Sequence, residues 1–402
     1  MKRILVLLGR YYPNASPNSV CVKNIIDCLP KDKYSVDIVS YDDGTDVAEK
    51  NNVRVNRGLL QSLIYKYESS NKTIIMKILQ FVLRIKTISC FLIWPWTDPI
   101  VTLKIKNKVN QLLKYQEYDY VLAVYMPLSS LIVANYVKQH HKSIKYIAYF
   151  LDSLSGGYLP NLLNNERYEN KLVKWEKRLI RNADNIVFMK SSESFHRQLY
   201  RNTEFESRIT YLDLPMLVER EALQTYKSTT KVLLYVGSLA ASIRSPEYII
   251  KVFSLIDDPD LEFQFVGDSA SEILNEYAKE DKRIKVIGKC AHEEALAYEK
   301  NADILINLGN KNPNLAPSKV FEYLSFGKKI VSTYSIDSDT SIQYLQKYNK
   351  ALLLDERNED YVSVSNVLAK FIYQNEEEIH FEDIASMYWD NTPQAFTALL
   401  DE

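Results

Sequence analysis

Short runs of apolar residues alternate with longer amphipathic segments through most of the chain. In the first half, helical periodicity over residues 19–29 and 128–138 predicts amphipathic helices. Five apolar runs have the length and composition of β-strands, at residues 4–8, 35–40, 120–125, 145–151 and 185–189. Strands that alternate with helices pair in parallel and are covered on both faces. The pattern therefore predicts a parallel α/β sheet for the first half.

The second half repeats this alternation more regularly. Six strand-like runs occupy residues 231–236, 261–266, 284–287, 304–307, 329–333 and 351–354. The helices between them are predicted to begin near Pro246, Ser271, Glu293, Pro317, Thr340 and Tyr361. The predicted fold class is therefore α/β, with two Rossmann-like domains.

A polar stretch at residues 219–230, EREALQTYKSTT, separates the two sets of strands and has the composition of a linker. We therefore predict domains over residues 1–218 and 231–379. Beyond them the strand pattern stops, although Trp389 and Phe396 keep the segment apolar. Apolar side chains gain free energy when they leave water, so residues 380–402 are predicted to cross back and pack on the first domain.

The composition excludes several classes of protein. The chain has 402 residues, of which 46% are hydrophobic and 25% charged, and such a chain can bury two cores. A formal net charge of −1 argues against a nucleic-acid binder that relies on bulk charge. The cysteines Cys21, Cys28, Cys90 and Cys290 form no CxxC pair and have no His cluster nearby, which suits the cytoplasm and predicts no metal site. Arg10 and two tyrosines follow the first apolar run where a signal peptide would need small residues, so that run is predicted to be a strand.

Neither domain carries a nucleotide-binding glycine motif of the common kinds. The turn after the first strand reads GRYYPNASPNS and has one glycine where GxGxxG needs three. No GxxxxGK[ST] loop is present either. A nicotinamide or flavin enzyme is therefore disfavoured, and a ligand is expected at the carboxyl ends of the strands.

Residues 314–331, NLAPSKVFEYLSFGKKIV, combine a helix start with charged side chains. Pro317 begins the predicted helix, and Ser318 and Lys319 lie in its first turn, where free backbone N–H groups favour a diphosphate. Glu322 lies one turn further on and is suited to accept hydrogen bonds from sugar hydroxyls. The alternative is an ordinary helix start with a solvated glutamate.

This segment resembles the donor-binding segment of glycosyltransferase family 4, retaining enzymes of the GT-B fold, in the subgroup with the pattern PSKxxEYLxxGKxIV. The resemblance extends to YVGSL at 235–239, FVGD at 265–268 and IKVIGKCAHEEALAYEKNADILIN at 284–307. In the first domain it includes KYIAYFLDS and WEKRLIRNADNIVFMKS. It implies two domains facing a cleft and metal-independent, retaining transfer of a hexose-type sugar from a UDP- or GDP-sugar. The implied acceptor is a glycan or a lipid-linked glycan in surface polysaccharide assembly.

The resemblance also implies the site residues. Donor-binding positions are Gly237, Ser238, Arg244, Gly267, Gly288, Lys289, Asn314, Pro317, Ser318, Lys319 and Glu322. Catalytic positions are Asp152, Asn314 and Glu322, and acceptor-binding positions are Tyr12, Asn18, Ser19 and Asp152. The chain departs from the family at Asn314, where a glutamate is usual, and at Ser238, where an arginine is usual. Arg244 is therefore the candidate phosphate clamp, because guanidinium pairs bidentately with phosphate.

Simpler roles for these residues stay open. Asp152 is equally suited to a turn, Asn18 and Ser19 to a helix cap, and Arg244 to a solvated surface. The DxD of Asp337 and Asp339, a metal motif in another glycosyltransferase fold, is interpreted as helix capping. Two alternative functions also remain: a non-catalytic relative in a glycan assembly complex, favoured by Asn314, and a GT-B sugar-nucleotide epimerase, which would need more His and acidic groups in the first domain.

Residues 72–96 carry a separate signal. One narrow polar stripe (Thr73, Lys77, Gln80, Arg84 and Thr87) runs along an otherwise apolar helix, and its charges are too frequent for a membrane span. Between Lys66 and Lys114 there are nine Lys or Arg and only two acidic residues. The segment is suited to the inner membrane surface, with Trp94 and Trp96 at the headgroup level. The alternative is a helix packed between the sheet and a neighbouring helix.

Overall fold

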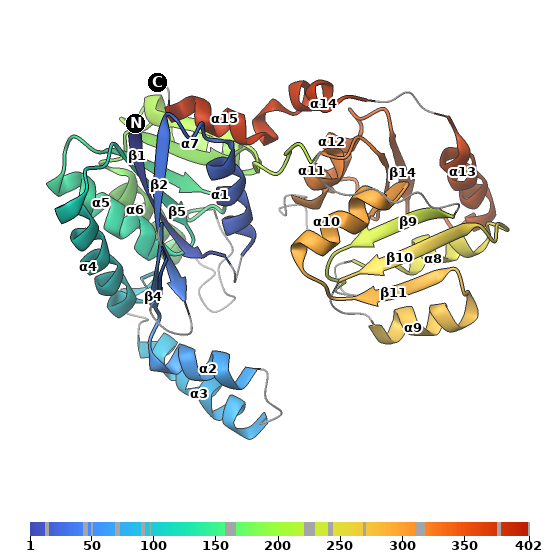
Figure 1. Ribbon diagram of the computed structural model, residues 1–402, viewed down its shortest axis with the longest axis horizontal. Helices are drawn as coiled ribbons and strands as arrows, with labels where there is room; N and C mark the ends of the chain where they lie inside the picture. The colour runs from blue at the N-terminus through green and yellow to red at the C-terminus, as the bar shows by residue number, and fades with distance from the viewer. Residues whose placement is uncertain are drawn as a thin grey trace. The chain divides into compact units, whose positions relative to one another are not determined.

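The structure is a computed structural model of the chain, and its parts are described one by one. It describes residues 1–12, 16–42, 47–49, 51–68, 73–89, 93–96, 98–156, 166–220, 230–239, 244–267, 271–309, 318–375 and 379–400. The chain forms two compact units, Met1–Pro215 together with Pro393–Glu402, and Met216–Thr392. Each unit is an α/β sheet with helices packed on it (Figure 1).

The first unit is built on an eight-stranded sheet in the order β3-β4-β2-β1-β5-β6-β7-β8. Its strands are β1 (Lys2–Arg10), β2 (Tyr34–Asp42), β3 (Val47–Glu49), β4 (Asn52–Asn56), β5 (Tyr120–Tyr125), β6 (Lys145–Phe150), β7 (Asn185–Met189) and β8 (Ile209–Leu212). All five predicted strands are present and parallel, as expected. The additional strands are short and lie toward the two edges, where exposed backbone and polar side chains weaken the apolar pattern. Only β3 is antiparallel.

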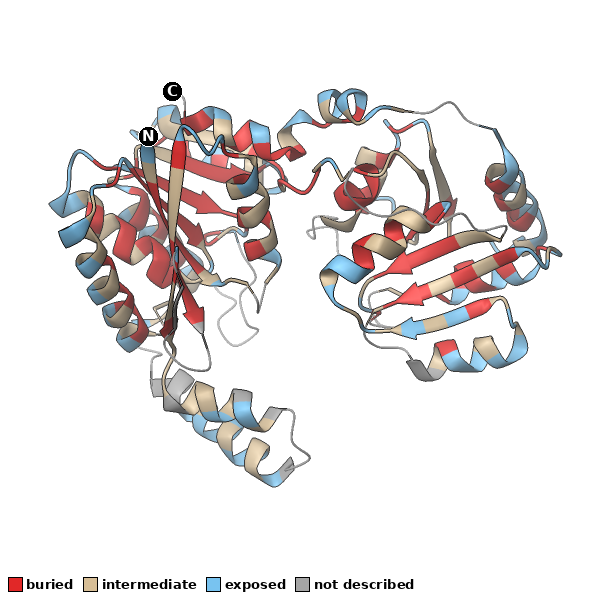
Figure 2. Cartoon of the chain, in the orientation of Figure 1, coloured by how far each residue is buried: buried red, intermediate tan, exposed pale blue. Residues whose placement is uncertain are grey.

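Helices cover both faces of this sheet and bury its strands (Figure 2). The helices of this unit are α1 (Pro17–Cys28), α2 (Leu59–Glu68), α3 (Thr73–Ser89), α4 (Pro99–Tyr115), α5 (Leu128–His140), α6 (Glu166–Ile180), α7 (Glu193–Tyr200) and α15 (Pro393–Thr397), of which α2 and α3 pack on each other. The central strands are nearly continuous apolar runs, and β5 and β6 are buried along most of their length. A strand covered on both faces has no polar side to alternate with, which explains the unbroken runs in the sequence.

The second unit has a six-stranded parallel sheet in the order β11-β10-β9-β12-β13-β14. Its strands are β9 (Lys231–Val236), β10 (Leu261–Val266), β11 (Ile284–Gly288), β12 (Ile304–Asn307), β13 (Lys329–Tyr334) and β14 (Ala351–Asp355). Its helices are α8 (Glu247–Ser254), α9 (Ser271–Glu280), α10 (His292–Asn301), α11 (Ser318–Leu324), α12 (Thr340–Leu345), α13 (Tyr361–Tyr373) and α14 (Phe381–Met387). Every predicted strand and helix start of this half is observed within two residues.

The end of the chain returns to the first unit, but later than predicted. Phe396 packs on Tyr149 with ring centroids 4.8 Å apart, and α15 lies beside α1. Residues 380–392 instead stay with the second unit, because the Tyr388 hydroxyl donates to the carbonyl of Tyr344. The backbone N–H of Leu217 also donates to the carbonyl of residue 391. The crossing therefore starts at residue 393, and the units divide after Pro215, before the polar stretch expected to separate them.

Two tryptophans predicted to lie at a membrane surface are packed inside the first unit. Trp94 meets Tyr168 edge to face, with centroids 5.7 Å apart, and Trp96 lies 6.5 Å from Trp175. The Trp96 indole N–H donates to the Thr102 hydroxyl at 2.9 Å. Both rings are partly buried against the core, which favours the packed alternative for these two residues.

Replacing Trp96 with alanine is expected to lower the free energy of unfolding by about 2 kcal/mol, because a half-buried indole loses both its packing and its hydrogen bond. Chemical denaturation measures this loss. Trp389→Ala is the matched control, since that ring is 50% exposed, and it should change stability by less than about 0.5 kcal/mol. Equal effects of the two substitutions would contradict the packed position of Trp96.

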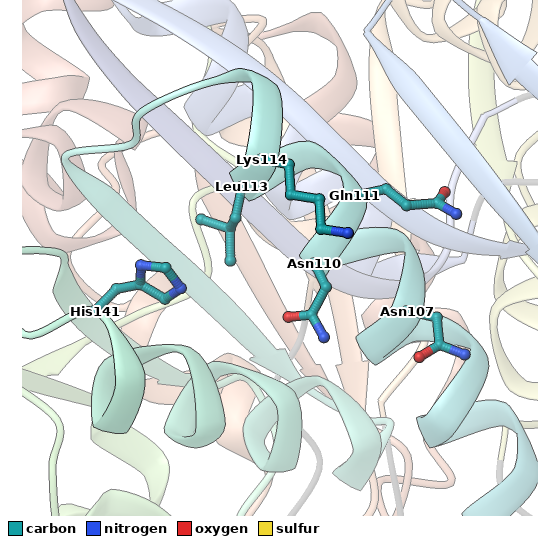
Figure 3. Close-up of a pocket in the computed structure, with 6 residues that line it drawn as sticks. All are labelled: Asn107, Asn110, Gln111, Leu113, Lys114 and His141. Carbon is teal, nitrogen blue, oxygen red and sulfur yellow. The ribbon is translucent and has the colours of Figure 1, made fainter.

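A surface pocket of about 500 Å³ lies on the first unit, between α4 and the end of α5 (Figure 3). It is lined by Asn107, Asn110, Gln111, Leu113, Lys114 and His141. None of these is a predicted site residue, so the pocket is separate from the constellations described below.

Candidate functional site

Five of the predicted donor residues follow three neighbouring strands of the second unit. Gly237 and Ser238 follow β9, Gly267 follows β10, and Gly288 and Lys289 end and follow β11. Backbone hydrogen bonds of 2.9 Å join Gly237 to Val266 and Gly267 to Gly288. The predicted residues are therefore brought together at the carboxyl edge of the sheet.

Gly267 is required at this edge by a close backbone approach. A Cβ atom at this position would lie 2.0 Å from the carbonyl oxygen of Gly237, and its φ of +143° is unfavourable for other residues. Any side chain would force the two strand ends apart. The absence of a side chain at Gly267 therefore lets the ends of β9 and β10 lie close together.

Helix α11 is held over the end of β9 by Tyr323. The buried Tyr323 hydroxyl accepts a hydrogen bond from the backbone N–H of Val236 at 3.0 Å. Gly327 then ends the turn that follows the helix, with φ of +63°. Residues Ser318, Lys319 and Glu322 all lie on α11, whereas Asn314 and Pro317 lie outside the described residues.

Lys319 and Glu322 belong to a buried ion cluster. Lys319 Nζ lies 2.7 Å from Glu299 Oε1 and also contacts Glu322 Oε1. The second oxygen of the Glu322 carboxylate, Oε2, lies 3.8 Å from Arg220 Nη2 and 3.7 Å from His292 Nε2. Both carboxylates are essentially inaccessible to solvent. A cation thus bridges two buried acids, and two further basic groups stand near Glu322.

Three members of this cluster were not predicted as site residues. His292 begins α10, and Glu299 lies seven residues later on the same face of that helix. Arg220 is placed by the strand-like segment before it, because the backbone N–H of Val218 donates to the Ser325 hydroxyl at 3.1 Å. The sequence contained a signal for Glu299, because the spacing places this glutamate on the same helix face as apolar residues that are buried in α10. Arg220 gave none, since it lies in a polar stretch with linker composition.

The charges in the cluster are set by burial and by Lys319. Burial, followed by the charge of Glu322, raises the pKa of Glu299 to about 8. Burial also opposes ionisation of Glu322, but Lys319 together with His292 and Arg220 outweighs it and lowers that pKa below its ordinary value. The pKa of His292 is lowered by burial. Of the two carboxyls, Glu322 therefore ionises more readily than Glu299, and burial favours the neutral form of His292.

Buried polar atoms without partners identify where the cluster can accept a ligand. Arg220 Nε and Nη2, Arg244 Nε and Glu299 Oε2 are buried and have no hydrogen-bond partner. Arg244 also interacts with the Tyr235 hydroxyl at the end of β9. Buried donors without acceptors are costly, and an anionic group would satisfy those of the two arginines.

In the first unit, the predicted acceptor residues gather at the carboxyl ends of β1, β5 and β6. Asn18 Nδ2 donates to the carbonyl of Tyr125 at the end of β5, and Asp152 follows β6. Tyr12 follows β1 and lies under Lys23, whose Nζ is 5.7 Å from the ring centroid. Asp152 is exposed, and partial desolvation raises the pKa of its carboxyl.

Ser19 is not available to a ligand in this structure. Its side chain is fully buried and takes part in a capping box with Ser16, which is the N-cap of α1. The capping role was the alternative given to Asn18 and Ser19, and Ser19 has it. Asn18 does not cap α1, because its amide reaches across to β5.

A buried polar network holds the loop that carries Asp152. Glu176 accepts hydrogen bonds from the backbone N–H and the hydroxyl of Ser155, at 3.0 and 2.7 Å, and from the Tyr200 hydroxyl at 2.7 Å. His196 Nε2 lies 3.5 Å from the same carboxylate and 3.4 Å from the Ser153 hydroxyl. Glu176 and His196 are both fully buried, so α6 and α7 fix the loop after β6 from beneath.

One of the two aspartates of the DxD motif has the helix-capping role that was predicted for both. Asp339 caps α12 by accepting a hydrogen bond from the backbone N–H of Ser341 at 2.8 Å. Asp337 instead lies 2.6 Å from Arg357 Nη2. Within the described part of the chain, no group of three His, Cys, Asp or Glu side chains is placed to hold a metal ion.

With this geometry in place, residues 230–362 match the family Glycosyl transferases group 1. The matched residues include the three strand ends, Arg244 and most of the ion cluster, while Arg220 precedes them. A comparison with curated protein sequences gives no match.

Solved structures share the fold over the length of the chain. A sucrose-phosphate synthase from Thermosynechococcus elongatus is 13% identical with a TM-score of 0.63, covering 100% of this chain and 98% of that one. Anabaena Alr3699/HepE in complex with UDP and glucose is 12% identical with a TM-score of 0.55 and covers 100% of both chains. A Listeria monocytogenes protein described as a UDP-N-acetylglucosamine 2-epimerase is 10% identical with a TM-score of 0.56, covering 98% and 94%. The fold is therefore GT-B, with two Rossmann-like units.

Proposed function

We propose that this protein is a glycosyltransferase that uses a nucleoside diphosphate sugar as donor. The observation that carries the proposal is that residues 230–362, whose strand ends and α11 gather the predicted donor residues, match the family Glycosyl transferases group 1. Arg220 and Arg244 supply buried N–H groups for the diphosphate. Glu322, ionised by Lys319, accepts hydrogen bonds from hydroxyl groups of the donor.

The reaction proposed is transfer with retention of anomeric configuration and without a metal ion. The bond from the anomeric carbon to the β-phosphate oxygen breaks, and a bond to an acceptor hydroxyl oxygen forms on the same face. The acceptor proton passes to the departing phosphate oxygen, so no covalent enzyme intermediate is needed. The donor is a UDP- or GDP-linked hexose, and Asp152 orients the acceptor while Asn314 contacts the transferred sugar.

The acceptor proposed is a glycan or a lipid-linked glycan in surface polysaccharide assembly. The enzyme meets it from the cytoplasm at the inner face of the membrane. No helix in the described residues is long and apolar enough to cross a membrane. The contact with the membrane that we propose is peripheral.

Thermal unfolding with a panel of nucleotides and nucleotide sugars tests donor binding. At 100 times its dissociation constant, the correct diphosphate is expected to stabilise the protein by about 2.7 kcal/mol. Arg244→Ala should weaken nucleoside diphosphate binding about 10- to 100-fold and nucleoside binding little, since a charge-assisted hydrogen bond contributes about 1.5 to 3 kcal/mol. Arg357→Ala removes an exposed arginine of the same unit and serves as the control. Equal losses for nucleoside and diphosphate would contradict the clamp role.

The products separate transfer from its alternatives. Incubation of the stabilising nucleotide sugar with glycan acceptors, followed by NMR of the new linkage, is expected to show the donor's anomeric configuration retained. Release of an epimerised sugar would instead indicate an epimerase. Tight donor binding without turnover on any acceptor would favour the non-catalytic relative.

A further inference from the structure

Helices α2 and α3 carry a set of exposed apolar side chains on the first unit. The two helices pack side by side, and much of α3 is exposed (Figure 2). Five large apolar residues of α3 are between 43% and 76% exposed: Ile74, Ile78, Phe81, Val82 and Ile85. Their spacing puts them on one face of the helix, while Ile75, Met76, Leu79 and Leu83 are partly covered. The segment therefore has one covered and one open apolar face.

The start of α4 also carries exposed apolar side chains. Ile100 and Leu103, in the first two turns of α4, are 67% and 58% exposed. Lys104 joins this part of α4 to the end of β4, shortly before α2, because its Nζ donates to the carbonyl of Asn56 at 3.0 Å. Leu63 of α2 is 41% exposed as well. We define these eight residues as the hairpin surface: Leu63, Ile74, Ile78, Phe81, Val82, Ile85, Ile100 and Leu103. A monomer rarely exposes so many large apolar residues without a partner.

The charged side chains described on α3, which carries most of the hairpin surface, are all positive. Lys77 and Arg84 are exposed and stand four residues before and three residues after Phe81, so they border the apolar face. Between Glu68 and Asp98 the chain contains no Asp or Glu. Lys66 of α2 is also exposed. The chain as a whole has a net charge of −1, so the positive charge is local to this segment.

We propose that the hairpin surface binds the anionic surface of a lipid bilayer, with Phe81 and its apolar neighbours in the interface and Lys77 and Arg84 on the headgroups. An exposed helix with an apolar face and basic borders lies in the plane of an interface. Two copies of the chain joined face to face would bring like charges together, whereas anionic headgroups neutralise them. This deepens the location given under the proposed function, but its test uses lipid alone and needs no donor.

Flotation of the full-length protein with vesicles tests the proposal. We expect binding to vesicles of phosphatidylglycerol and phosphatidylcholine at low salt, much weaker binding to phosphatidylcholine alone, and release by salt as screening shortens the reach of the charges. Lys77→Gln with Arg84→Gln should weaken binding about 30-fold. Lys282→Gln with Lys285→Gln makes the same charge change at exposed lysines of the second unit and should leave binding unchanged.

The apolar contribution has its own matched pair. Ile78→Ser with Phe81→Ser should weaken vesicle binding at least about tenfold at any salt concentration. Val362→Ser with Val367→Ser changes two exposed residues of α13 and should have no effect. Phe81→Trp should be quenched by brominated acyl chains, and Val362→Trp should not. All four side chains are exposed, and melting curves verify that each variant folds.

The proposal is overturned if the parent does not bind anionic vesicles at low salt, or if the control pairs lose binding as much as the hairpin pairs. It is also overturned if the parent self-associates in solution and the Ile78 and Phe81 substitutions make it monomeric, which would assign the surface to a second copy. Loss of vesicle binding in these tests leaves the donor-binding measurements of the parent unaffected, so the two proposals fail separately.

Discussion

Glu322→Gln is expected to lower sugar transfer at least about 100-fold while the protein stays folded. Two charge-assisted hydrogen bonds to donor hydroxyls are lost, and each contributes about 1.5 to 3 kcal/mol. The fold survives because Glu299 can replace the lost charge. Glu322 is one reason that the pKa of Glu299 is raised, so its removal lets Glu299 ionise beside Lys319. The expected loss of stability is therefore about 1 kcal/mol or less.

Glu299→Gln is the matched control, because both carboxylates are buried and both contact Lys319. The raised pKa of Glu299 favours its neutral form, which an amide resembles, so Glu299→Gln should keep activity within about twofold. A carboxyl whose pKa is raised from 4.5 to about 8 on folding makes the parent lose stability as pH rises between these values. Glu299→Gln should therefore gain stability relative to the parent over that window, as measured by denaturation from pH 5 to 8.5. If Glu299→Gln were inactive and Glu322→Gln active, the roles assigned to the two glutamates would have to be reversed.

Lys319→Met is expected to give the largest loss of stability. It removes the cation that two buried carboxylates share, and breaking one side of a buried ion pair costs about 3 to 5 kcal/mol. For a domain of this size the melting temperature should fall by roughly 10 °C. The pKa of Glu322 is lowered in the folded protein, so the parent's benefit from ionised Glu322 is present above about pH 4.5 and lost as pH falls through the folded pKa. The loss in Lys319→Met should accordingly be smaller at pH 4 than at pH 7.

Two further variants decide whether charge or packing is responsible. Lys319→Arg keeps the positive charge. Its loss of stability should be less than half of the loss in Lys319→Met. Lys319→Met combined with Glu322→Gln removes both partners and should be more stable than Lys319→Met alone, since no uncompensated charge remains. If the double variant loses the sum of the single losses, the ion cluster does not act as a unit.

Most of the strands and helix starts could be predicted, because the sequence of a parallel α/β sheet has a strong pattern of apolar and polar residues. A strand such as β5 is covered on both faces, so each of its residues is apolar and the run stands out between amphipathic helices. The glycines after β9, β10 and β11 were expected from the family resemblance, and at Gly267 the structure shows that the approach of Gly237 leaves no room for a side chain. The edge strand β3 and its neighbour β4 were missed, since a short, partly solvated strand carries polar residues and a weak pattern.

The ion cluster could be predicted only in part. Lys319 and Glu322 are neighbours on one helix and belong to a recognisable motif. Arg220 joins them from a segment about one hundred residues away, and it does so because Val218 is bonded to Ser325 after α11. The local surroundings determine the charges of the cluster. Glu299 and Glu322 have the same side chain, but burial raises the pKa of Glu299 whereas Lys319 lowers the pKa of Glu322. Neither long-range bonding nor burial is visible in a local pattern.

The segment at 72–96 shows the same division. The sequence by itself determined an amphipathic, basic helix without acidic residues, and this depends only on the order of side chains along one element. The tertiary structure decided which apolar residues are open to solvent: the face with Phe81 is exposed, while Trp94 and Trp96 are packed against Tyr168 and Trp175. The physical reason is that periodicity records which residues share a face, whereas exposure depends on what the rest of the chain places against that face.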